Sequence, residues 1–248
     1  MNIVVCVNHV PDTETKVKVS SDRKTLDRAG VNWMLSPYDE FAVEECLRLR
    51  DKFGGQVTVI SLGGDTHKET IRKTLAMGVD KALLLKDDST RDSFSIASAI
   101  AEAVKGLNPE IVFFGKQSID YYNEQIPGMV AELLNWPSVS VVVKFELQDG
   151  KVTCEREIEG GHEVVETSLP LVVAAQKGLN EPRYPSLKGI MAAKSKPIEE
   201  KQPAVTENRV EVLEMKKPAP KPVGKIVGTD ATAAAELVKL LHEEAKVI

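Results

Sequence analysis

The chain has 248 residues, of which 42% are hydrophobic and 28% are charged, and its net charge is −5. This composition supports a packed core in one or two domains, and the mild acidity argues against nucleic acid as a partner. The apolar runs are far shorter than the ~18 residues that a membrane span needs, and no secretory signal pattern opens the chain. Three widely spaced cysteines without CxxC argue against a disulfide framework or a zinc site, so we expect a cytoplasmic protein.

The first half of the chain alternates between strand-like and helix-like segments. Residues 3–7 form an apolar, β-branched run, which predicts a strand buried on both faces. Ser36 and Pro37 predict the start of a helix that ends at Gly54, and residues 17–20 and 25–28 predict a hairpin. Further strands are predicted at 56–62, 82–85 and 110–114. Each is followed by a predicted helix: one that ends before Gly78, one at 92–105 and one at 124–134.

The pattern changes to consecutive strands after Pro137. Residues 139–147 and 151–156 flank the turn sequence Gln-Asp-Gly, and two more strands are expected at 163–168 and 171–175. We therefore expect an α/β fold with a doubly wound, mostly parallel sheet and added antiparallel hairpin strands.

The C-terminal part is expected to be an extended arm that ends in a helix. Prolines are frequent from residue 194 to residue 225, and the segment from Lys216 to Pro222 alternates Lys, Ala and Pro. Residues 231–245 predict an amphipathic helix. Such a helix needs a surface to pack on, either on its own domain or on another subunit.

Two glycine-containing loops are candidates for binding an anion, although the phosphate-binding patterns GxxxxGK[ST] and GxGxxG are absent. The first loop, 61–66, joins a strand to a helix, and it is either an anion site or an ordinary turn. The second loop, 115–120, follows a buried strand, where open α/β sheets bind ligands. This loop is either a ligand site or a capped loop with solvated side chains.

The titratable residues show no catalytic or metal-binding pattern. The four histidines lack HxxxH and HExxH spacing, so we expect them to be surface or core residues. Cys6 lies inside an apolar strand and is expected to be buried. The residues alone therefore predict a nucleotide-binding α/β protein with no evident catalytic group of its own and no metal.

Residues 180–191 combine two prolines and an Arg-Tyr pair with apolar side chains, directly after the last expected strand. Arg and Tyr are favoured at interface hot spots, and an exposed apolar tip needs a reason. The alternative is a loop whose Leu187 packs into the core. We favour a partner-binding loop, with the candidate contacts Arg183, Tyr184, Leu187, Ile190 and Met191.

Five segments, in order and at compatible spacing, carry a resemblance that covers nearly the whole chain. They are SPYDEFAVEE at 36–45, ETIR with LAMG at 69–78, GKQSID at 115–120, REIEGG at 156–161 and LNEPRY at 179–184. Together they resemble the beta subunit of electron transfer flavoprotein. The resemblance implies a heterodimer whose alpha subunit holds most of one FAD, while this subunit covers the FAD and binds a structural AMP. It also implies an adenine nucleotide alpha hydrolase-like domain at 1–193, with an arm and helix at 194–248 that pack on the alpha subunit.

Site residues follow from the same resemblance. The implied AMP contacts are Cys6, Ser36, Pro37, Tyr38, Asp39, Leu62, Gly115, Lys116, Gln117, Ser118, Ile119, Asp120, Tyr121, Tyr122, Asn123, Glu124, Gln125 and Ile126. Thr13 and Tyr38 match positions at the edge of the FAD. Leu187 matches the tip of the loop that binds partner flavin dehydrogenases, from which the carrier passes electrons to an acceptor.

Two other functions stay open. Some relatives bifurcate electrons from NADH with a second FAD in place of AMP. Their sequences have a pattern similar to Asp-Gly-Asp-Thr after the loop that corresponds to residues 115–120. Here Tyr-Tyr-Asn-Glu follows Asp120, which favours the AMP type, while Pro127 removes one N–H near the helix start. The third alternative is a stand-alone nucleotide-binding stress-type protein, although such a protein has no need for the arm and its helix.

Overall fold

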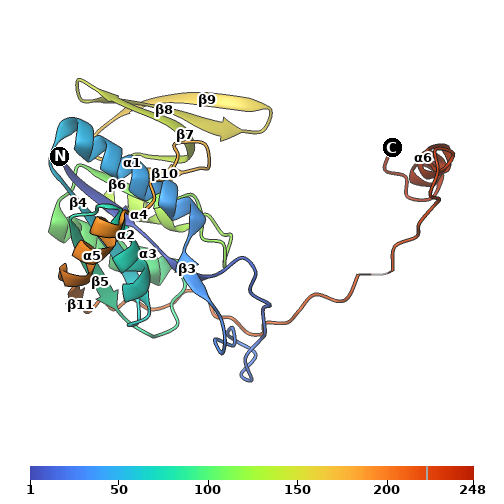
Figure 1. Cartoon of the computed structure of the whole chain (residues 1–248), viewed down its shortest axis with the longest axis horizontal. Helices are drawn as coiled ribbons and strands as arrows, with labels where there is room; N and C mark the ends of the chain where they lie inside the picture. Colours follow the sequence, from blue (N-terminus) through green and yellow to red (C-terminus); the bar gives the residue numbers. More distant parts are fainter. Residues whose placement is uncertain (222) are drawn as a thin grey trace.

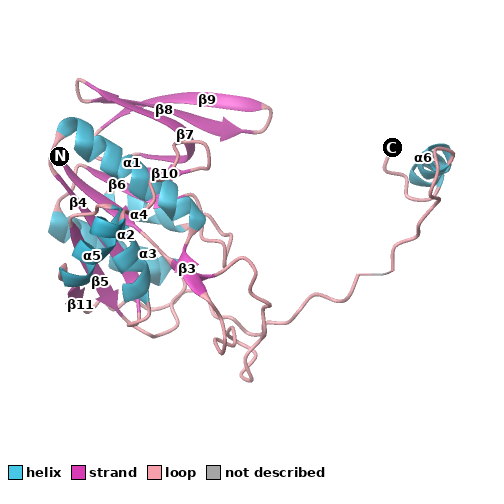
Figure 2. Cartoon of the chain, in the orientation of Figure 1, coloured by secondary structure: helices cyan, strands magenta, loops and turns pink. Residues whose placement is uncertain are grey.

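The computed structural model describes residues 1–221 and 223–248, and a mixed sheet forms the centre of that described part (Figure 1, Figure 2). Its strand order is β11-β5-β4-β1-β6-β10-β7-β8-β9. All neighbours from β11 to β7 pair in parallel, and β7, β8 and β9 form an antiparallel extension. This topology confirms the expected fold class. The strands are β1 (Asn2–Cys6), β4 (Gln56–Gly63), β5 (Lys81–Lys86), β6 (Ile111–Gly115), β7 (Ser138–Gln148), β8 (Lys151–Ile158), β9 (Gly161–Ser168), β10 (Leu171–Ala175) and β11 (Glu199–Lys201).

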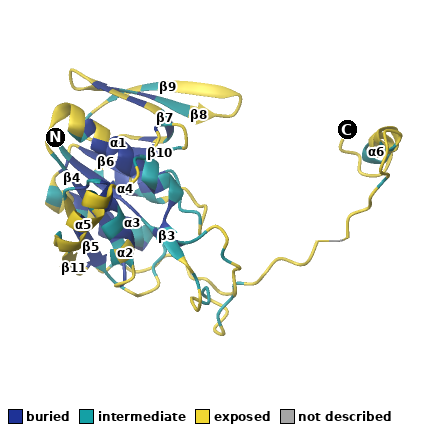
Figure 3. Ribbon diagram, in the orientation of Figure 1, coloured by how far each residue is buried: buried dark blue, intermediate teal, exposed yellow. Residues whose placement is uncertain are grey.

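Helices cover both faces of the parallel part, with α1 (Pro37–Phe53) and α2 (His67–Met77) on one face and α3 (Ser93–Leu107) and α4 (Ile126–Leu134) on the other. Successive side chains of a strand point to opposite faces. Ile3 and Val5 of β1 therefore pack with α1 and α2, while Val4 and Cys6 pack with α3 and α4. Buried residues concentrate in these layers (Figure 3), which explains why β1 has no polar face.

The helix boundaries follow the expected signals with one shift. Helix α1 begins at Pro37 and ends before Gly54, which takes φ +73° as glycine readily does. Helix α4 begins at Ile126 and not at the predicted residue 124, because Glu124 takes a left-handed φ of +52°. Pro127 then lies in the first turn, where its missing N–H costs nothing.

The predicted hairpin at 17–20 and 25–28 is wrong in extent, because it is reduced to a single bridge between Val19 and Leu26. Val17 is 51% exposed, so a longer ladder would bury little apolar surface there. The chain instead pairs β2 (His9–Pro11) with β3 (Trp33–Leu35) in an antiparallel ladder. Each of these strands has three residues, too few for a period-2 pattern to predict.

Two unpredicted elements follow β10. Helix α5 (Leu187–Ser195) starts directly after Ser186, whose hydroxyl accepts the N–H of Gly189 at 3.0 Å. Strand β11 pairs in parallel with β5, so the sheet extends past residue 193 to residue 201. Both elements are too short for periodicity alone to predict, and both are held by contacts distant in sequence.

The arm then runs along the domain before it departs toward α6 (Ala233–Glu243), which lies far from the sheet in Figure 1. The N–H of Met215 donates to the carbonyl of Arg23 at 2.6 Å, the last such tie before residue 221. Residues 216–221 form neither helix nor strand, as expected, and Pro222 lies outside the described residues. Among the described residues, no helix is long and apolar enough to cross a membrane.

Asp92 joins the arm to the start of α3. Its Oδ1 accepts the N–H of Ser95 at 2.8 Å as a helix cap, and its Oδ2 accepts the N–H groups of Arg209 and Val210 at 2.6 and 3.0 Å. The N–H of Asp92 in turn donates to Oδ1 of Asn208 at 3.0 Å. One carboxylate therefore serves both a helix end and the arm.

Replacing Asp92 with alanine should lower the free energy of unfolding by about 1–2 kcal/mol, because the cap of α3 is lost. The same change should speed tryptic cleavage after Arg209, which is already exposed, because the backbone of the arm loses its anchor there. Thr66→Ala is the matched control, since Thr66 is exposed at the cap position of α2 but makes no capping bond. Urea unfolding and limited proteolysis measure both effects. Equal effects of the two substitutions would contradict the dual role of Asp92.

Candidate functional site

The candidate site lies at the carboxyl ends of β1 and β6, where the chain order of the sheet reverses. Strand β1 is flanked by β4 on one side and β6 on the other, which is the position where open α/β sheets bind ligands. The start of α1 closes this edge. Asp39 accepts the N–H of Asn8 at 2.7 Å on Oδ2 and the N–H of Gly115 at 3.0 Å on Oδ1. One side chain therefore joins the loops that follow both strands.

Gly115 is required for this close approach. A Cβ at this position would overlap Asp39 Oδ1 and lie 2.7 Å from the Cβ of Tyr38. The backbone of β6 therefore packs directly on the first turn of α1. Cys6 ends β1 beneath the same turn, and burial, together with the nearby Asp39 carboxylate, raises the pKa of its thiol.

Burial also raises the pKa of Asp39 to about 7, even though its two amide donors favour the charged form. The side chain is 6% exposed and sits in the first turn of α1, where the helix dipole favours an anion. Burial therefore disfavours the charged form of this carboxyl group, while the hydrogen bonds to its oxygens and the helix dipole favour that form.

Lys116 places a positive charge beside this junction. Its Nζ lies 5.4 Å from the ring centroid of Tyr38 and 3.6 Å from a carboxylate oxygen of Glu124. Its N–H donates to the carbonyl of Ala175 at 2.9 Å, which ties the loop to β10. The junction therefore has an aromatic face and the cation of Lys116 beside it, and the carboxylate of Glu124 competes for that cation.

The rest of the loop bends away from the sheet before α4. The N–H of Tyr122 donates to the carbonyl of Ser118 at 3.0 Å, and the side chain of Asn123 bonds Ser93 at 3.0 Å. Tyr121 and Tyr122 are 69% and 63% exposed. Their rings therefore lie largely in solvent, and a bound molecule or a second subunit has room to cover them.

Ser36 places an unpaired polar group at this edge. Its side chain is 0% exposed, and its Oγ has no hydrogen-bond partner among the described residues. Buried hydroxyls in proteins normally have such a partner. The Oγ of Ser36 is therefore an unsatisfied polar atom between the carboxyl end of the sheet and α1.

The structure brings some of the expected AMP positions into contact and leaves others apart. Tyr38, Asp39, Gly115 and Lys116 meet around the start of α1. Leu62 and Ile126 are partly buried and pack with the core cluster that contains Cys6. The remaining loop positions lie at partly or fully exposed places between β6 and α4, namely Gln117, Ile119, Asp120 and Gln125. Thr13 is exposed in the loop after β2.

The other candidate loop, 61–66, has a structural explanation for its glycines. A Cβ at Gly63 would overlap the ring of His67, and a Cβ at Gly64 would overlap the carboxylate of Asp88. Thr66 occupies the cap position of α2 without a capping bond. The structure therefore favours the ordinary turn over an anion site.

The expected partner-binding loop presents its apolar side chains to solvent. Tyr184 is 96% exposed and Leu187 is 79% exposed, and Met191 and Ile190 on α5 are 59% and 43% exposed. Leu187 therefore does not pack into the core, which was the alternative. Arg183 differs from its neighbours, because its guanidinium group bonds Glu44 and Asp51 on α1.

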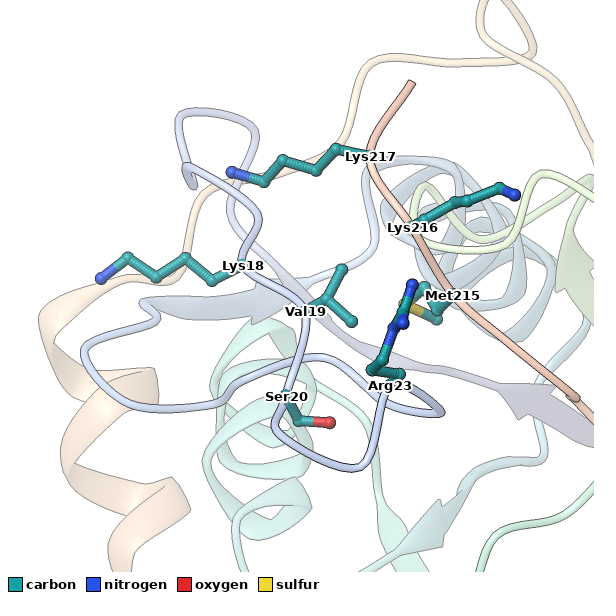
Figure 4. A pocket seen from close by; sticks show the side chains of 7 residues that line it. All are labelled: Lys18, Val19, Ser20, Arg23, Met215, Lys216 and Lys217. Carbon is teal, nitrogen blue, oxygen red and sulfur yellow. The ribbon is translucent and has the colours of Figure 1, made fainter. Parts of the chain in front are cut away.

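A pocket lies between the N-terminal loop and the arm (Figure 4). It has a volume of about 430 Å³ and is lined by residues 18–20, Arg23 and residues 215–217. Lysines dominate its rim, and the arm forms one wall. Arg23 is already paired with Glu214 beside it, so this pocket reflects how the arm crosses the N-terminal loop.

Two histidines that the sequence analysis treated singly lie together beside β2. The ring of His9 stacks on Trp33 with centroids 4.9 Å apart, and it lies 5.1 Å from the ring of His67. His9 Nδ1 is 2.7 Å from the hydroxyl of Thr70, and His67 Nδ1 is 3.0 Å from that of Ser61. Sequence reasoning missed this cluster because it depends on the β2–β3 ladder, which brings Trp33 onto His9.

Burial, with smaller effects of His9 and Arg28, lowers the pKa of His67 to about 4. The unfolded chain protonates this histidine below about pH 6.5 while the folded chain does not, so its contribution to stability falls as the pH drops from 6.5 to 4. The loss should approach about 3 kcal/mol. The loss of stability is measured as the difference between the unfolding free energies of the wild type and His67→Gln, from urea unfolding at each pH. Asp39 stabilises the folded chain as the pH drops, but it is present in both proteins and cancels in the difference. A pH-independent difference would contradict the low pKa.

Gly115→Ala should destabilise the protein by about 1–3 kcal/mol, because a methyl group there displaces Asp39 and Tyr38. The variant should also retain less nucleotide, because the two loops are no longer joined. Gly161→Ala is the control, since nothing lies within 4 Å of a Cβ at that glycine. Thermal unfolding and nucleotide content after purification test both expectations. Wild-type behaviour of Gly115→Ala would show that the close approach is not required.

Comparisons with known proteins identify the family of the chain. A model of the electron transfer flavoprotein domain matches residues 24–206. The chain is 41% identical over its full length to electron transfer flavoprotein subunit beta of Syntrophomonas wolfei, of which it covers 98%. It is 38% identical to the subunit beta of Bacillus subtilis and 36% identical to the mitochondrial subunit beta of Oryza sativa, over the full length of both chains in each case. The chain therefore belongs to the electron transfer flavoprotein family, among its beta subunits.

Proposed function

We propose that this chain is the beta subunit of a heterodimeric electron transfer flavoprotein of the single-FAD type. With an alpha subunit that holds most of the FAD, it receives electrons from flavin dehydrogenases and passes them to an acceptor. The observation that carries the proposal is the similarity to beta subunits over the whole chain. It is an electron carrier, and bound FAD supplies the redox chemistry that amino-acid side chains lack.

We assign a structural AMP to the edge formed by β1, β6 and the start of α1. The unpaired, buried Oγ of Ser36 supports a polar ligand at this edge. Tyr38 offers an aromatic face, and Lys116 offers a positive charge that suits a phosphate. The residues present therefore fit a nucleotide, while the carboxyl groups of Asp39, Asp120 and Glu124 oppose an anion.

The FAD is proposed to lie against Thr13 and Tyr38. Thr13 follows β2, Tyr38 follows β3, and the β2–β3 ladder joins these two segments. Because Thr13 is exposed and Tyr38 is only partly buried, both are available to a cofactor that a second subunit carries. The role of this chain is then to cover the cofactor and exclude water from it.

The arm and α6 are proposed to pack on the alpha subunit. No residue of α6 is buried, and its Leu237 and Val238 are 46% and 54% exposed. An amphipathic helix of 11 residues is marginal without a surface to cover its apolar face. A second subunit provides that surface, and this requirement distinguishes the heterodimer from a stand-alone nucleotide-binding protein.

Nucleotide content tests the proposal. The chain is co-expressed with its alpha subunit, the purified complex is denatured, and the released FAD and AMP are quantified. One FAD and one AMP per heterodimer are expected, and the chain alone should be colourless. The Gly115→Ala heterodimer should lose AMP, because the methyl group displaces Asp39 and Tyr38 at this edge, and it should keep its FAD, because the alpha subunit holds most of that cofactor.

Other stoichiometries point to the competing functions. Two FAD and no AMP would overturn the single-FAD type and favour electron bifurcation from NADH. A stable monomer that retains ATP without flavin would favour the stand-alone protein.

A further inference from the structure

The partner-binding loop is exposed at its tip and firmly bound at its base. Arg183 donates through its backbone N–H and its Nε to Oε2 of Glu44, at 3.1 and 2.8 Å, and through NH2 to Oε1 of the same carboxylate at 3.1 Å. Its NH1 donates to Asp51 at 3.1 Å. Every branch of the guanidinium group is therefore engaged with α1.

Glu44 is an unusual partner for a surface loop, because its side chain is only 5% exposed. Burial works against its charge, but the hydrogen bonds from Arg183 and Arg48 hold its pKa below the usual value. A two-point Arg–carboxylate pair fixes orientation as well as distance, which a lysine does not. A buried carboxylate also makes loss of the arginine costly.

A second contact fixes the loop to the same helix. Asn180 Nδ2 donates to the carbonyl of Phe41 at 3.0 Å and to Oε2 of Glu45 at 2.9 Å. Asn180 is 9% exposed, so this contact is shielded from water. The loop is therefore held on one face of α1 by two of its own residues, Asn180 and Arg183.

Helix α5, which carries Leu187, is held from the other side by α2. Arg72 donates to the carbonyls of Ala193 and Lys196, and Lys196 Nζ donates to the carbonyl of Val79 at 2.6 Å. A Cβ at Gly189 would overlap the carbonyl oxygen of Ala76, so α5 lies directly against the end of α2. The segment that leads into Leu187 is thus fixed on α1, and the helix that follows Leu187 is fixed on α2.

We propose that Arg183 is a positioning residue, which pairs with buried Glu44 to hold Leu187 and Tyr184 in the orientation that a partner dehydrogenase binds. This inference rests on the proposed function of the loop. Pre-organising an exposed apolar tip reduces the ordering cost of association. Arg183 itself faces α1, so its effect on docking passes through the loop and not through direct contact.

The test uses the heterodimer with Arg183→Lys, Leu187→Ala and the double variant. Arg48→Lys is the matched control, because Arg48 bonds the same Glu44 carboxylate at 3.0 Å and has no hydrogen bond to the loop. If Arg183→Lys fails to fold, Glu44→Gln replaces it, because this substitution keeps the side-chain volume and removes the charge that pairs with Arg183. Hydrogen exchange of the backbone amides of residues 184–191 measures how well the loop is ordered. KM and kcat are measured for electron transfer from a flavin dehydrogenase, which is purified for its ability to reduce the wild-type heterodimer.

Arg183→Lys and Glu44→Gln should speed amide exchange at 184–191 and raise KM about tenfold, with kcat nearly unchanged. Arg48→Lys should change neither quantity. In the Leu187→Ala background, Arg183→Lys should add little to the rise in KM, because both substitutions act on one docking element.

Hydrogen exchange and KM together distinguish the positioning role of Arg183 from the proposed docking function of the loop. Unchanged exchange in Arg183→Lys would overturn the positioning role whatever the kinetics show. Fully additive effects on KM would show that Arg183 contacts the partner independently, which also overturns it. If exchange becomes faster while Leu187→Ala leaves KM unchanged, the clamp exists but the docking function proposed for the loop is wrong, and the inference fails with it.

Discussion

The carboxylate of Asp39 is the interaction on which the rest of the candidate site depends. It joins the amide of Asn8, after β1, to the amide of Gly115, at the end of β6, and it does so from the first turn of α1. A carboxylate offers one oxygen to each donor, which an asparagine cannot do, and only glycine at 115 leaves room for the contact. Because burial raises the pKa of Asp39 to about 7, the site depends on a charge that the interior disfavours and that the amides and the helix start support.

Helix α1 carries both regions for which a function is proposed. Asp39 near its start organises the proposed nucleotide edge, and Glu44 and Glu45 in the following turn hold the loop that is proposed to bind a partner. A carrier must keep one cofactor covered while it docks transiently on several proteins, so rigid presentation of a small apolar tip suits this task. The two regions share one packed helix and need no catalytic residue between them.

The sequence predicts the βα units because each combines an apolar strand with an amphipathic helix and a glycine stop. It does not predict β11 and α5, which are short and depend on distant contacts such as those of Arg72 with Ala193 and Lys196. The family resemblance supplies Tyr38, Asp39 and Gly115, and the structure shows them meeting. The pairing of Arg183 with Glu44 spans 139 positions, and no local pattern distinguishes such a clamp from an interface arginine.

The most direct test of this account is a crystal structure of the heterodimer with its natural nucleotides. The account predicts AMP at the carboxyl ends of β1 and β6, in contact with Tyr38 and with a hydrogen bond to the buried hydroxyl of Ser36, while Asp39 still joins Asn8 and Gly115. A nucleotide bound elsewhere, or a Ser36 hydroxyl satisfied by protein atoms alone with this edge closed, would contradict it.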